Sequence, residues 1–143
     1  MRKTFPTALL LVALLAGGCS HGKKKSVLDT TCPKPPSTAS AGNAQISARA
    51  LGASYAKKVV IHATEKSNGA PVHDGKVTIY AQMSCPHYMR LYQQKLKETA
   101  PGTYKSPYQL VMPGTWAFYI VLRAKNGDAT TSALPVTVKA PGT

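Results

Sequence analysis

Four side chains that can bind a soft metal ion stand at alternate positions of one short stretch. They are Met83, Cys85, His87 and Met89. In an extended chain, alternate side chains project from the same face, so these four would lie together. Thioether, thiolate and imidazole groups favour Cu(I), whereas Mg²⁺ and Ca²⁺ prefer oxygen ligands. The spacing predicts a copper site, although Pro86 weakens the alternation because proline lacks a backbone donor and bends a strand.

Each of these residues also has an explanation that involves no metal. Methionine commonly fills gaps in protein cores, and a histidine more often makes a local hydrogen bond. Cys85 is one of three cysteines, and Cys32 is a candidate disulfide partner in an oxidising compartment. Such a disulfide would remove the Cys85 thiolate from the ligand set. We expect Cys85 to be reduced at least while metal is bound, with Met83, His87 and Met89 as co-ligands.

The start of the chain has the features of a lipoprotein signal peptide. A basic beginning precedes an apolar run over residues 8–16, and small residues up to Gly18 come directly before Cys19. The run is too short for a membrane span. We expect the signal peptide, residues 1–18, to direct export of the protein and then to be removed. Lipidation of Cys19 would then anchor the protein to a cell-envelope membrane. An ordinary cleaved signal peptide is the alternative.

Residues 19–43 are expected to form a flexible tether. They contain three consecutive lysines and a proline-rich segment, with few apolar side chains and no regular period. A coil of this length has a root-mean-square span of roughly 25–30 Å. Residues 44–143 remain for one folded domain, which is enough for a single modest core.

The charge of the chain limits the classes of partner and function. Eighteen lysines and arginines stand against five acidic residues, and the formal net charge is +13. This balance favours anionic partners such as membrane lipid, an acidic envelope protein or a copper-acceptor protein. We expect no nucleic-acid partner, because the chain is exported and lacks basic residues interleaved with clustered aromatics.

An enzymatic function is not expected from these residues. The few acidic side chains are scattered and offer no paired-carboxylate site, and no glycine-rich phosphate loop precedes a helix. Cys85, His87 and Asp74 do not form a plausible thiol catalyst, because nothing in the sequence orients the histidine.

Alternation of apolar and polar residues predicts an all-β domain. Seven short segments separated by turn signals show this pattern; they are residues 44–51, 57–65, 76–83, 90–98, 104–111, 116–123 and 130–139. In the clearest of them, Trp116, Phe118, Ile120 and Leu122 share one face. We therefore expect a seven-stranded, antiparallel β-sandwich of the immunoglobulin-like type with Trp116 in its core.

Several short motifs occur in the order found in a known family. They are Gly69–Val72, Lys76–Met83, the stretch that ends at Met89, Gly102–Tyr104 and Met112–Trp116. Together they resemble the YtkA-like family of small, exported immunoglobulin-like domains. The resemblance covers Ile46 to Val138, which is essentially the whole expected domain.

The resemblance implies copper handling outside the cytoplasm. Members of the family are associated with supplying copper for respiratory oxidase assembly. The resemblance therefore implies that this chain buffers or delivers Cu(I), either for such assembly or for copper tolerance. The methionine- and histidine-rich loop of the family corresponds here to Met83, His87 and Met89, and a methionine before the Gly-x-Trp motif corresponds to Met112. This chain has Cys85 where methionine, glycine or proline is more usual.

An alternative function requires no metal. The domain would then be a structural or interaction module that docks to an envelope complex through its basic surface.

Two more histidines, His62 and His73, lie outside the alternating stretch. We expect His73 to reach the same end of the sandwich as Met83, and His62 to face solvent or the second face of its sheet; an ordinary surface position is the alternative for both.

Overall fold

The computed structural model describes residues 34–52, 55–140 and 142. The expected signal peptide, the lipidation site Cys19 and the cysteine Cys32 lie outside this range. Within it, no helix has the length and apolar character needed to cross a membrane.

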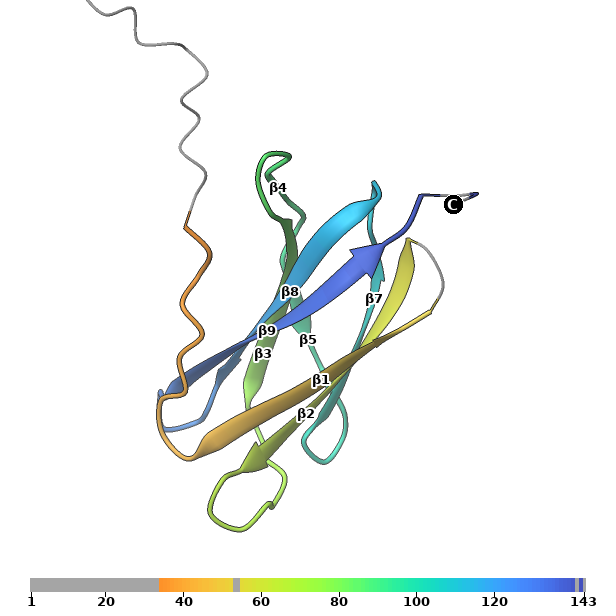
Figure 1. The fold of residues 1–143 in the computed structure, drawn as a ribbon. Coiled ribbons are helices and arrows are strands. Elements are labelled where there is room, and N and C mark those ends of the chain that lie inside the picture. Colours follow the sequence, from red (N-terminus) through yellow and green to blue (C-terminus); the bar gives the residue numbers. More distant parts are fainter. Residues whose placement is uncertain (1–33, 53–54, 141, 143) are drawn as a thin grey trace, which may run out of the picture. The chain divides into compact units, whose positions relative to one another are not determined.

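In the described part of the chain, nine strands form two antiparallel sheets that face each other as a sandwich (Figure 1). The first sheet contains, in spatial order, β1 (Ala44–Leu51), β2 (Ala56–Glu65), β7 (Thr103–Gln109) and β6 (Glu98–Ala100). The second contains β4 (Met89–Arg90), β3 (Lys76–Met83), β8 (Gly114–Arg123) and β9 (Ala129–Val138), with β5 (Gln94–Leu96) also paired to β3. The order β1-β2-β7-β6 opposite β3-β8-β9 is that of an immunoglobulin constant-type domain, so the predicted fold class is confirmed.

The core lies between the two sheets and is built by the alternation seen in the sequence. Trp116, Phe118, Ile120 and Leu122 of β8 all face inward, and none is more than 1% exposed. The facing side chains include Ile61 of β2, which is also fully buried. The prediction that Trp116 belongs to the core is therefore confirmed.

The strand expected over residues 90–98 is the main difference from prediction. Three short strands replace it: β4 pairs with the end of β3, β5 with the start of β3, and β6 with β7 of the other sheet. A segment that passes from one sheet to the other must bend and cannot keep one register. This crossing accounts for nine strands in place of seven.

The segment before β1 is attached to the edge of the second sheet. The amide of Thr131 donates to the carbonyl of Ala39 at 2.6 Å, and that of Ala41 donates to the carbonyl of Ala129 at 3.3 Å. The hydroxyl of Thr130 also donates to the Ala41 carbonyl, at 3.1 Å. The folded part of the chain thus begins before residue 44, the boundary expected from the sequence.

Candidate metal site at the methionine end of the sandwich

The stretch with alternating metal-binding side chains is a hairpin, not an extended strand. β3 ends at Met83 and β4 begins at Met89, and these two residues are direct cross-strand partners. The chain reverses between them through a turn that contains the cis peptide bond Cys85–Pro86. The prediction that all four side chains share one face is wrong, because Pro86 cannot continue the ladder of hydrogen bonds. As direct cross-strand partners, Met83 and Met89 face the same side of the sheet.

Met83 lies deepest of the four candidate ligands. It is 4% exposed and belongs to the hydrophobic core. Its cross-strand partner on β8 is Trp116, which is completely buried. The Met83 methyl group reaches Gly114 at the start of β8, where an added Cβ atom would lie 2.7 Å from Met83 Cε. The absence of a side chain at Gly114 makes room for this thioether.

Met112 and Met89 complete a group of three methionines at this end of the molecule. Both are half-buried and pack against the core. The carbonyl oxygen of Met112 accepts a hydrogen bond from the indole Nε1 of Trp116 at 3.1 Å, which holds the turn before β8 close to the partner of Met83. Three of the four methionines in the sequence therefore lie at this end of the sandwich. Met83 is the cross-strand partner of both Trp116 and Met89, and Met112 lies just before β8. We name this group the methionine cluster (Met83, Met89 and Met112).

The two remaining candidate ligands lie in the exposed turn of the hairpin. The side chains of Cys85 and His87 are both solvent-exposed. Cys85 is disulfide-bonded, and its expected partner Cys32 lies outside the described residues. A disulfide sulfur is not a thiolate ligand, so in this state the structure does not support Cys85 as the expected metal ligand. Its reduction during metal binding remains a prediction.

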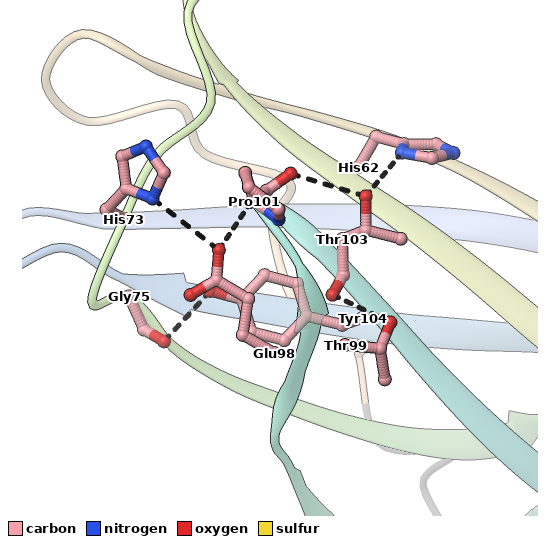
Figure 2. A network of polar contacts seen from close by, with 9 residues as sticks. His62, His73, Gly75, Glu98, Thr99, Pro101, Thr103 and Tyr104 are labelled. Carbon is pink, nitrogen blue, oxygen red and sulfur yellow. Dashed lines mark hydrogen bonds and ion pairs between the residues drawn. The ribbon is translucent and has the colours of Figure 1, made fainter.

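His62 and His73 lie at the other end of the sandwich from Met83, and Figure 2 shows them among the polar contacts of that end. His73 precedes the first residue of β3, whereas Met83 is the last, and eight strand residues span roughly 25 Å. The expectation that His73 lies at the same end as Met83 is therefore wrong. His62 is exposed, with its Nδ1 3.2 Å from the Thr103 hydroxyl, so its predicted outward orientation is confirmed.

A network of polar contacts holds this second end together (Figure 2). The Glu98 carboxylate accepts a hydrogen bond from the Gly102 amide and lies 3.8 Å from Nδ1 of His73. The buried Tyr104 hydroxyl donates to the Gly75 carbonyl at 3.1 Å. Burial, with the nearby Glu98 carboxylate, raises the pKa of Tyr104 above its ordinary value. We name this group the polar network (His73, Gly75, Glu98, Gly102 and Tyr104).

Glu98 and Tyr104 are not among the residues predicted from the sequence to form a site. The local signal for Glu98 was the turn Ala100-Pro101-Gly102 directly after it, since a carboxylate near a tight turn commonly accepts a backbone hydrogen bond. Nothing local indicated that Tyr104 reaches Gly75, which lies 29 residues away along the chain.

Among residues 34–52, 55–140 and 142, no three His, Cys, Asp or Glu side chains are grouped so that they could hold a metal ion. The methionine cluster, with His87 in the turn beside it, is the arrangement that offers soft ligands.

Comparison with known proteins agrees with the motifs. A sequence model of the YtkA-like family matches residues 37–121, a range that contains the methionine cluster and His87 and ends within β8. No curated protein sequence matches the chain. The matched range is more than half of the 143 residues, and the chain therefore belongs to the YtkA-like family.

Proposed function

We propose that this protein is an exported, lipid-anchored copper-binding protein that buffers or delivers Cu(I) outside the cytoplasm. The observation that carries the proposal is the gathering of Met83, Met89 and Met112 at one end of a YtkA-like domain. In this proposal the protein acts by binding and not by catalysis.

The ligands in this region suit Cu(I) in kind. Thioethers and imidazole are soft or borderline donors, and they bind Cu(I) in preference to Mg²⁺ or Ca²⁺. Met89 and Met112 are only half-buried, and His87 is exposed, so these three are the residues that solvent and an incoming ion reach first. Met83 lies behind them in the core. A bound Cu(I) would be the cargo of the protein, and transfer to a copper-acceptor protein would take place from this exposed side.

A competition titration tests the proposal. The mature chain and the variant M89L/M112L are titrated with Cu(I) against a chromophoric chelator; leucine keeps the apolar volume and removes both sulfurs. We expect the variant to bind at least tenfold more weakly. The matched control is H62A/H73A, which removes two histidines at the opposite end and should leave the affinity within twofold. Equal, weak binding by all three proteins would contradict the copper function.

The state of Cys85 is a separate part of the proposal. We expect that a reduced chain binds Cu(I) more tightly than the disulfide-bonded chain, because reduction adds a thiolate beside His87. The comparison of the reduced chain with C85S measures the contribution of this sulfur. Thiol labelling of unreduced protein taken from its native envelope establishes which form exists there; a Cys32–Cys85 crosslinked peptide without free thiol would contradict a resident reduced Cys85.

A second candidate function has its own supporting observations. Met83 is a core residue, Met89 and Met112 pack against that core, and Cys85 is disulfide-bonded, as expected for a structural or interaction module that binds no metal. The titration above separates the two functions, because in such a module the loss of two thioethers leaves the negligible affinity for Cu(I) unchanged.

Membrane anchoring is proposed from the sequence around Cys19. A C19S variant should lose incorporation of labelled fatty acid and leave the membrane fraction. Retention of C19S in that fraction, with unchanged labelling, would contradict the anchor.

A further inference from the structure

The outer face of the second sheet carries a hollow that is distinct from the methionine cluster. Its volume is about 580 Å³, which is within the usual range for ligand sites. Side chains of β3, β5 and β8 line it, among them Lys76, Thr78, Tyr80, Lys95, Val121 and Arg123. Alternation along these strands directs the core residues to the other face of the sheet, so the hollow faces away from the sandwich core.

Positive charge in this hollow is concentrated and uncompensated. Lys76 and Arg123 stand directly opposite each other on β3 and β8, and Lys95 is the partner of Thr78 on the next outward-facing rung. Like charges at directly opposed positions destabilise a sheet. The ion pair between His73 and Glu98 is the only one between described residues, so none of the three cations forms an ion pair with a carboxylate of this part of the chain.

The basic surface continues along the sheet beyond the hollow. Arg90 of β4 is the cross-strand partner of Gln82, and its guanidinium lies 4.0 Å from the centre of the Tyr80 ring. Cations therefore flank β3 at residues 76, 78 and 82. These rungs cover roughly 20 Å at the usual rise of a strand. We name this surface the basic track (Lys76, Arg90, Lys95 and Arg123).

We propose that the basic track binds an extended, acidic segment of a partner protein. A single small anion would neutralise one end of a surface of this length, whereas carboxylates at alternate residues of an extended segment repeat every ~7 Å and match successive outward rungs. Arg123 can pair with a carboxylate through two hydrogen bonds.

A flat membrane surface fits this site less well than a peptide does. The cations surround a recess in the sheet face, and a planar layer of headgroups meets the rim of such a recess before its floor. The proposal is independent of copper binding, because no residue of the basic track belongs to the methionine cluster.

Binding of a defined acidic peptide tests the proposal. A fluorescein-labelled ten-residue peptide of alternating glutamate and valine is titrated with the mature chain, and fluorescence anisotropy reports the affinity. We expect the variant K76Q/R123Q to bind at least tenfold more weakly. The control K58Q/K105Q removes two exposed lysines from the outer face of the first sheet and should bind within twofold of the unchanged chain. A peptide with glutamine in place of glutamate should not bind.

A thermal melt of the same variants shows whether each of them is folded. K76Q/R123Q should unfold at a higher temperature than the unchanged chain without peptide, because the opposed like charges are removed. Equal weakening in K76Q/R123Q and K58Q/K105Q would overturn the proposal in favour of general charge attraction. Binding to phosphatidylglycerol vesicles that depends on Lys76 and Arg123, with no binding of the peptide, would overturn it in favour of a membrane surface.

Discussion

The two ends of the sandwich are held by different forces. At the end with the methionine cluster, Met83 belongs to the hydrophobic core and Met89 and Met112 pack against it, and one indole hydrogen bond fixes the turn before β8. At the other end the polar network joins the connection before β3 to the turn between β6 and β7 through hydrogen bonds and one ion pair. One end is held by apolar burial and the other by directed polar contacts.

This difference explains where function is expected. Thioether packing is non-directional and methionine is conformationally adaptable, so the methionine end can rearrange around an ion at small cost. Hydrogen bonds of buried groups tolerate little displacement, because an unpaired buried donor or acceptor is costly. We therefore expect a structural role for the polar network and place the proposed metal site at the methionine end.

The largest expected effect is at the centre of the methionine end. Trp116→Ala removes a completely buried indole and should lower the free energy of unfolding by ~3–5 kcal/mol. Urea denaturation of the mature chain measures it. Trp116→Phe keeps most of the apolar contact and should lose less. If Trp116→Ala lost under 1 kcal/mol, packing around the indole would not be what holds this end.

Gly114→Ala examines how tightly Met83 is packed. Gly114 has φ of +135°, a conformation that an L-residue adopts with strain, so a loss of ~1–3 kcal/mol is expected. The added methyl group also displaces Met83 Cε. Gly127→Ala is the control, since Gly127 has φ of +92° but no heavy atom within 4 Å of an added Cβ. Chemical denaturation measures the free energy of unfolding of both variants. An equal loss in the two would mean that the Met83 side chain moves aside at no energetic cost.

Glu98→Ala weakens the polar end. It removes the acceptor for the Gly102 amide, and we expect a loss of ~1–2 kcal/mol in the free energy of unfolding. Glu98→Gln retains an acceptor oxygen and should lose less. His73→Ala should change stability by under ~0.5 kcal/mol, because its ion pair is largely exposed to solvent. A larger loss in His73→Ala than in Glu98→Ala would reverse the roles assigned to the two residues.

Tyr104→Phe should have a smaller effect than Glu98→Ala at neutral pH, a loss of ~1 kcal/mol from the hydrogen bond to Gly75. Its clearer signature is at alkaline pH. Burial raises the pKa of Tyr104 from 10.0, so the folded state retains the proton more strongly than the unfolded state. The resulting stability is fully present below pH 10 and is lost as the pH rises through the raised pKa.

Thermal melts between pH 8 and pH 11 test this pH dependence. The midpoint should fall above pH 10 in the unchanged chain and fall less steeply in Tyr104→Phe. Tyr80 and Tyr108 also have pKa values raised by burial, so part of the decline should remain. Identical profiles for the two proteins would show that Tyr104 does not titrate with unfolding.

The sequence by itself determined the class of the fold, the core and the family. Alternation of apolar and polar residues is a local property, and in an antiparallel sandwich it translates directly into inward and outward faces. For that reason the buried face of β8, from Trp116 to Leu122, was predicted correctly. The order and spacing of the motifs that indicated the YtkA-like family can likewise be seen directly in the sequence.

Only the tertiary structure decided which residues meet. The reversal between Met83 and Met89, the passage of residues 90–98 from one sheet to the other and the position of His73 all depend on strand register and long-range pairing. The opposition of Lys76 and Arg123, 47 residues apart along the chain, is of the same kind. Register is fixed by burial of a whole sheet face and not by any single segment, so these juxtapositions could not be derived from the sequence pattern alone.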